Sequence, residues 1–126
     1  MEPLISATLR HPHRVFFPGD ELLCEYQLDA VMQSDVHAVE AAVLWFTEGK
    51  GTEDMGVHCF HRRTPDDAED QDLRSLHQFG TILPNSPLSY SGLIVKIRWC
   101  VRIRLFLRDA RQYHHDIPFE LRARPC

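Results

Sequence analysis

The chain has 126 residues, of which 44% are hydrophobic and 25% charged, and its formal net charge is -4. A chain of this size and balance can bury one core, so we expect a single soluble domain over residues 1–126. The negative net charge argues against nucleic acid as a partner. The apolar runs are too short for a transmembrane segment, and the N-terminus shows no signal-peptide pattern. The sequence therefore predicts a cytoplasmic protein.

The N-terminal part alternates apolar and polar residues in stretches that are separated by turn signals. Residues 4–10 and 21–29 each predict a strand with one apolar side, and a Pro-Gly turn lies between them. Residues 38–47 predict a further strand, because Val, Trp, Phe and Thr favour extended structure. Leu44 and Phe46 make the end of that stretch apolar on both faces, which is typical of a strand covered on each side.

The middle of the chain is less regular. Residues 57–63 predict a short strand, and an acidic loop follows at residues 64–72. Residues 73–83 resume extended structure, and residues 84–92 form a long loop whose two prolines and one glycine exclude a helix. The expected apolar anchors of the extended stretch are Leu76, Phe79 and Ile82.

The most regular stretch of the chain is residues 94–108. Its odd positions are all apolar, and most of its even positions are basic. Because successive side chains of a strand point to opposite sides, this period of two predicts a long central strand with one apolar and one basic face. The apolar side chains are Val95, Ile97, Trp99, Val101, Ile103, Leu105 and Leu107. The basic side chains are Lys96, Arg98, Arg102, Arg104 and Arg108.

A last strand is expected at residues 113–122, joined to the central strand by a short turn as a β-hairpin. Trp99 should lie in the core with Trp45 near it. The whole chain then has about seven strands and essentially no helix. These features predict an all-β fold, an immunoglobulin-like antiparallel β-sandwich. The side chains of the last strand that should face inward are those of Tyr113, His115, Ile117, Phe119 and Leu121.

Two motifs carry a resemblance to a known family. Residues 15–26, Val-Phe-Phe-Pro-Gly-Asp-Glu-Leu-Leu-Cys-Glu-Tyr, resemble the Val-Tyr-x-Pro-Gly-Glu-x-hydrophobic-x-Gly opening of arrestin-like domains. Residues 83–92, Leu-Pro-Asn-Ser-Pro-Leu-Ser-Tyr-Ser-Gly, resemble their Leu-Pro-x-x-x-Pro-x-Ser-Phe-x-Gly loop. Residues 95–101 resemble the Ile-Arg-Tyr-x-Val-Lys strand that follows this loop. The order of the motifs matches, and their spacing matches except that the loop has one residue fewer between its two prolines. The strand pattern extends the resemblance over most of the chain.

The resemblance implies a fold and a class of function. Arrestin-like proteins are built from immunoglobulin-like sandwiches, usually two in tandem, and act as adaptors and scaffolds rather than enzymes. It thus implies a non-catalytic domain that binds a protein partner. This chain departs from the pattern because it has room for one sandwich only, and because Cys24 stands where the family often has Gly. A lone sandwich should expose surface that its relatives cover, so we expect a homodimer through a sheet face or an open edge strand.

Histidine, serine and cysteine are present, but their spacing predicts neither a metal site nor a catalytic one. His58 and His61 would point to opposite faces of a strand and could not share a metal ion without a bulge. The sequence has no Gly-x-Ser-x-Gly motif and no phosphate-binding glycine-rich loop. Cys24, Cys59 and Cys100 lie in strand-like stretches, which is typical of buried thiols in a reducing compartment. We therefore expect no enzyme activity, no metal and no cofactor.

The basic face of the central strand is the candidate binding site, formed by Lys96, Arg98, Arg102 and Arg104. Two interpretations remain open. These cations could be neutralised by carboxylates on neighbouring strands. They could instead form a docking strip for a small anion, an acidic peptide or an anionic lipid headgroup. The carboxylates expected to neutralise the strip are Glu25, Asp29, Glu40 and Glu120.

Overall fold

The computed structural model describes residues 2–11, 13–51, 53–66 and 72–125, and in these residues the chain is all-β apart from one short 3-10 helix. Part of the predicted acidic loop, residues 67–71, lies outside the described residues. Two of the strands, β2 and β7, have only two residues each, which is why the sequence pattern predicted about seven. The strands are β1 (Leu4–Leu9), β2 (Val15–Phe16), β3 (Glu21–Asp29), β4 (Val36–Gly49), β5 (Met55–Arg63), β6 (His77–Ile82), β7 (Tyr90–Ser91), β8 (Val95–Leu107) and β9 (Gln112–Leu121), and the helix is η1 (Gln33–Asp35).

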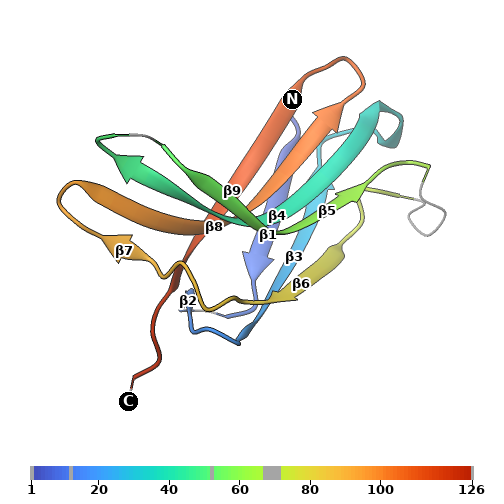
Figure 1. Ribbon diagram of the computed structural model, residues 1–126. Helices are drawn as coiled ribbons and strands as arrows, with labels where there is room; N and C mark the ends of the chain where they lie inside the picture. Colours follow the sequence, from blue (N-terminus) through green and yellow to red (C-terminus); the bar gives the residue numbers. More distant parts are fainter. Residues whose placement is uncertain (1, 12, 52, 67–71, 126) are drawn as a thin grey trace.

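The strands form two stacked sheets, so the predicted β-sandwich is confirmed (Figure 1). The smaller sheet has the order β1-β3-β6, and the larger has the order β2-β9-β8-β4-β5, with β7 also paired to β8. Neighbouring strands are antiparallel except β2 and β9, which are parallel. No helix in the described part of the chain is long and apolar enough to cross a bilayer.

Strand β8 organises the core as its alternation predicted. Trp99 is 1% exposed, and Val101, Ile103 and Leu105 on the same side are fully buried. The ring centroids of Trp99 and Phe119 are 5.8 Å apart, and Trp45 lies opposite Trp99 in the register of β4 and β8. The apolar face of this strand therefore points at the smaller sheet, and its basic face points away from it.

The smaller sheet confirms one prediction and corrects another. The apolar side that was predicted for residues 21–29 is buried in β3, where it consists of Leu22, Cys24, Tyr26 and Leu28. In β6, however, Leu76 and Ile82 are 62% and 57% exposed, so they are not anchors. The strand begins after Leu76, and its register sets Phe79 opposite Cys24, so that Ile82 falls on the outward side. Leu73 and Leu83 are buried instead.

Strand β9 is also partly different from the prediction. Ile117, Phe119 and Leu121 are buried as expected, but His115 is exposed and Tyr113 is only partly buried. Because β2 pairs with β9 only at Glu120 and Leu121, the first part of β9 is an edge, and its side chains can turn to water.

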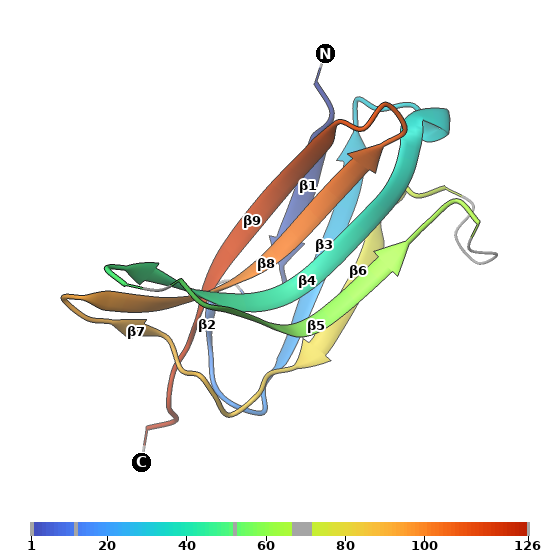
Figure 2. The same cartoon turned by 45° about the horizontal axis from the view of Figure 1, so that its top comes forward.

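One end of the larger sheet projects beyond the smaller one. The end of β4, the start of β5, β7 and the start of β8 form an arm that extends away from the sandwich (Figures 1 and 2). The two hairpins of the arm approach closely at Gly49, where a Cβ atom would clash with the carbonyl oxygen of Ile94. Gly49 also has a φ of +138°, a conformation that favours glycine.

Candidate functional site

The predicted basic residues lie where the alternation of β8 placed them. Lys96, Arg98, Arg102 and Arg104 project from the face of the larger sheet that is turned away from the smaller sheet, here called the outer face. Arg98 and Arg104 are exposed, whereas Lys96 and Arg102 are partly buried. The structure therefore brings the candidate residues together on one surface.

Each of the three arginines has a carboxylate neighbour. Arg98 Nε lies 2.7 Å from Glu48 Oε2, and Arg102 makes two hydrogen bonds to Asp116, at 2.9 and 3.1 Å. Arg104 lies 4.0 Å from Glu40 and donates a hydrogen bond to the side-chain oxygen of Gln112. Lys96 has no ion pair with any residue that the structure describes. The basic strip is thus largely neutralised within its own sheet.

Most of the neutralising carboxylates are not the predicted ones. Of the four candidates, only Glu40 pairs with the strip. Glu25 and Asp29 belong to β3 in the smaller sheet, where Glu25 lies 3.6 Å from Arg10. Glu120 pairs with Arg122, which lies just beyond the end of β9. Which carboxylate faces which arginine depends on the register between strands, and alternation within one strand does not determine that register.

The ion pair between Arg102 and Asp116 affects the groups around it. The hydrogen bonds that Arg102 donates to the Asp116 carboxylate raise the pKa of Arg102, so this guanidinium remains charged. Cys100 lies on the same face and is buried, and burial raises the pKa of its thiol to about 12. Cys100 is therefore a neutral apolar group and not a nucleophile.

The outer face also carries a second apolar cluster, which is separate from the core. Ala42, Leu44 and Cys100 are buried there, and Phe46 packs against them. Beside them on β5, three apolar side chains are each more than half exposed. The register sets Phe60 opposite Ala42 and Val57 opposite Leu44, so the two groups are continuous. We call this surface the outer apolar patch; its residues are Ala42, Leu44, Phe46, Met55, Val57, Phe60 and Cys100.

The ion pairs surround this patch. Arg102 and Asp116 lie on its β9 side, and Arg62 with Glu40 and Arg104 lies at one end. The sequence analysis recognised the arginines but missed the patch between them. Its signal was the pair Leu44 and Phe46, which made one end of β4 apolar on both faces. The exposed residues of β5 carried no clear signal, because a bulge interrupts the alternation there.

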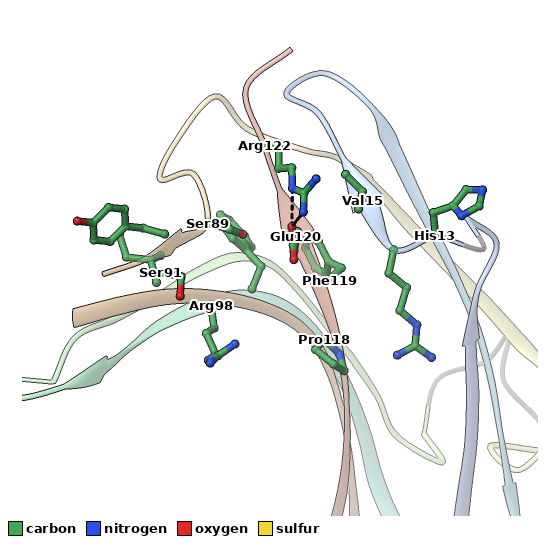
Figure 3. Close-up of a pocket in the computed structure, with 13 residues that line it drawn as sticks. His13, Val15, Ser89, Ser91, Arg98, Pro118, Phe119, Glu120 and Arg122 are labelled. Carbon is green, nitrogen blue, oxygen red and sulfur yellow. Dashed lines mark hydrogen bonds and ion pairs between the residues drawn. The ribbon is translucent and has the colours of Figure 1, made fainter. Parts of the chain in front are cut away.

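Two hollows in the described part of the chain lie along the larger sheet. One has a volume of about 640 Å³ and lies at the β4–β5 hairpin, where Phe46, Met55 and Arg102 contribute to its lining. The other has a volume of about 500 Å³ and lies where β9 leaves β8 to pair with β2, here called the fork (Figure 3). The lining of the fork includes Arg98 from β8, Glu120 and Arg122 at and just beyond the end of β9, and Ser89 and Ser91 (Figure 3).

The histidines of β5 are placed differently from the prediction. A β-bulge at His58 shifts the register, since Val43 pairs with Cys59 and Leu44 with Val57. As a result, His58 and His61 both turn toward the smaller sheet: the Nε2 atom of His58 lies 2.8 Å from the carbonyl oxygen of Ile82, and His61 stacks on His77. No group of three or more potential metal ligands occurs among the described residues.

The two-sheet architecture and the similarity to a solved structure described below identify an arrestin-like β-sandwich, the fold that the sequence motifs implied. No protein-family profile and no curated protein sequence matches this chain. A similar solved structure is that of Spo0M, a sporulation control protein from Bacillus subtilis, with a TM-score of 0.64 and 12% sequence identity. The match covers 97% of this chain and 50% of Spo0M, so this chain spans half the length of that protein.

Proposed function

We propose that residues 1–126 form one non-catalytic domain that binds another protein and acts as an adaptor or scaffold. The observation that carries this proposal is the outer apolar patch. Met55, Val57 and Phe60 are each more than half exposed, and they adjoin apolar residues that are buried on the face opposite the core. A contiguous exposed apolar surface on a domain of this kind marks an interaction site.

The surroundings of the patch support a protein as the ligand. Protein interfaces have an apolar centre, a polar rim and an enrichment of aromatic residues and arginine. Here Phe46 and Phe60 contribute to the centre, and Arg62, Arg98 and Arg102 with their carboxylates form the rim. Because the arginines are already paired, the rim would contribute orientation and specificity, and the apolar centre would contribute most of the affinity.

A second candidate function is the binding of a small anion or an acidic group, and the fork favours it. Arg14, Arg98 and Arg122 all line this hollow. Arg98 and Arg122 are paired with Glu48 and Glu120, but Arg14 has no carboxylate partner within the described ranges. If an acidic ligand binds there, the change Arg14→Glu should weaken binding of that ligand several-fold and leave binding at the patch unchanged.

The structural neighbour supports a regulatory class of protein in general terms only. Spo0M is a sporulation control protein, and its similarity to this chain is in the fold. We also place the protein in the cytoplasm. The described cysteines Cys24, Cys59 and Cys100 are free thiols, which suits a reducing compartment.

The proposal is tested by photo-crosslinking in the native host. A crosslinking amino acid at Phe60 should capture one or a few specific proteins, and the same amino acid at Leu76, which is similarly exposed and lies just before β6 of the smaller sheet, should not. Capture should persist at high salt, because an apolar centre is not screened. Binding should be lost with Phe60→Asp and retained with Leu76→Asp. If both positions capture the same proteins, the patch is not the binding surface.

A further inference from the structure

Strand β5 is the longest edge strand of the sandwich. It has nine residues, whereas the edge strands β1 and β6 have six each, β2 has two, and the part of β9 before its pairing with β2, Gln112–Phe119, has eight. Within the described part of the chain, β5 pairs only with β4. The N–H and C=O groups along its other side are therefore available for hydrogen bonds with another strand.

The bulge at His58 determines which side chains of β5 face outward. Before the bulge these are Met55 and Val57, which lie opposite Phe46 and Leu44. After the bulge they are Phe60 and Arg62, which lie opposite Ala42 and Glu40. The outward-facing residues of β5 are thus at positions 55 and 57 before the bulge and at positions 60 and 62 after it. This arrangement is symmetric about the middle of the strand.

We infer that two copies of this chain associate through β5, antiparallel and related by a two-fold axis. In the register that the symmetry selects, Val57 lies opposite the partner's Phe60, and Met55 lies opposite the partner's Arg62. In this register, each outward-facing side chain of one β5 strand lies beside an outward-facing side chain of the other copy. A shift of one residue would place outward residues of one copy beside inward residues of the other, which the period of two disfavours.

The side chains that meet in this register are compatible. Val57 and the partner's Phe60 form a pair of a β-branched and an aromatic residue, one of the favourable cross-strand combinations, and the two-fold axis produces it twice. Arg62 is held by Glu40 of its own chain, so it brings no unpaired charge against the partner's Met55. On the inward side, His61 lies opposite the partner's Gly56. No two like charges face each other.

This association would join the two larger sheets into one continuous sheet. The outer apolar patches of the two copies would then lie side by side on the same face. The inference goes beyond the proposed function, since it concerns the chain alone and is measured without any other protein.

The test is sedimentation velocity of the purified chain up to high micromolar concentrations. The wild type should shift from its monomer mass of 14.7 kDa toward twice that mass as concentration rises. The double variant V57K/F60K should remain monomeric, because each lysine at position 57 would face a lysine of the other copy. The variant V57K/F60E should dimerise again, since each lysine would then face a glutamate, and its dimer should weaken as salt is added.

The controls separate association from folding. Met32 is exposed and distant in sequence from β5, so M32K should dimerise as the wild type does. Circular dichroism and a thermal melt should show that all variants are folded. A wild type that stays monomeric, a V57K/F60K variant that still dimerises, or a V57K/F60E variant that does not recover would each overturn the inference. If the chain is monomeric but a crosslinking amino acid at position 60 captures a different protein, the dimer is refuted and the proposed function is still supported.

Discussion

The indole nitrogen of Trp99 donates a hydrogen bond to the backbone carbonyl of Pro87, 2.7 Å away. This bond joins the centre of the core to the loop between β6 and β7. The loop is held again farther along, where Ser89 donates its N–H to the carbonyl oxygen of Leu121 and accepts the N–H of Leu121 through its hydroxyl group. The loop that resembles the arrestin-like motif is thus attached to two strands and helps to form one side of the fork.

Trp99→Ala should lower the free energy of unfolding by roughly 3–5 kcal/mol, because it removes a large buried side chain and leaves a cavity. That loss is a large part of the stability of an ordinary domain. Trp99→Phe should lower the free energy of unfolding by less, because an aromatic ring still fills part of the space. It should not be neutral, because the hydrogen bond to the carbonyl oxygen of Pro87 is lost. Chemical denaturation of the two variants and the wild type measures the difference. Equal stability of wild type and Trp99→Ala would contradict the assignment of the core.

Gly49→Ala should destabilise the arm. A Cβ atom there would meet the carbonyl oxygen of Ile94, and the positive φ is unfavourable for alanine. We expect a loss of about 1–3 kcal/mol, the range for such backbone strain. Gly51→Ala is the matched control, since Gly51 also has a positive φ but nothing lies within 4 Å of its Cβ position. In thermal melts, the melting temperature of Gly49→Ala should be clearly lower than that of Gly51→Ala. The reverse order would refute the close approach of the two hairpins.

The pair Arg102 and Asp116 should be coupled more strongly than the pair Arg98 and Glu48. The first makes two hydrogen bonds with side chains about one-third exposed, and the second makes one with side chains about half exposed. A double-mutant cycle should give about 0.5–1 kcal/mol for the first pair and close to zero for the second, the range for surface pairs. If the coupling energy of Arg98 and Glu48 is larger than that of Arg102 and Asp116, solvent exposure does not determine the strength of these ion pairs.

Stability should fall as the pH rises above about 9. Burial raises the pKa of Cys24 and of Cys100 from 9.0 to about 12. Between these values the unfolded chain loses thiol protons that the folded chain retains, so unfolding becomes more favourable with increasing pH. Denaturation at pH 7 and pH 10 measures the loss, and it should be smaller in Cys24→Ala than in the wild type. Both buried thiols should also react slowly with iodoacetamide in the folded chain, compared with the partly exposed Cys59.

Much of the architecture could be predicted from local patterns. The alternation of β8 identified Trp99 as a core residue and placed Arg98, Arg102 and Arg104 on the opposite face, because the direction of a side chain in a strand depends only on its position along that strand. For the same reason, the sequence correctly predicted which face of β3 is buried.

Features that depend on pairing between strands were decided by the tertiary structure. The partners of Arg98 and Arg102 are Glu48 and Asp116 because of the registers of β4 and β9 against β8, which involve residues far apart in the sequence. The bulge at His58 exists only relative to β4, yet it decides which residues of β5 are exposed. Alternation within a strand is a local property, whereas register results from packing the whole sandwich.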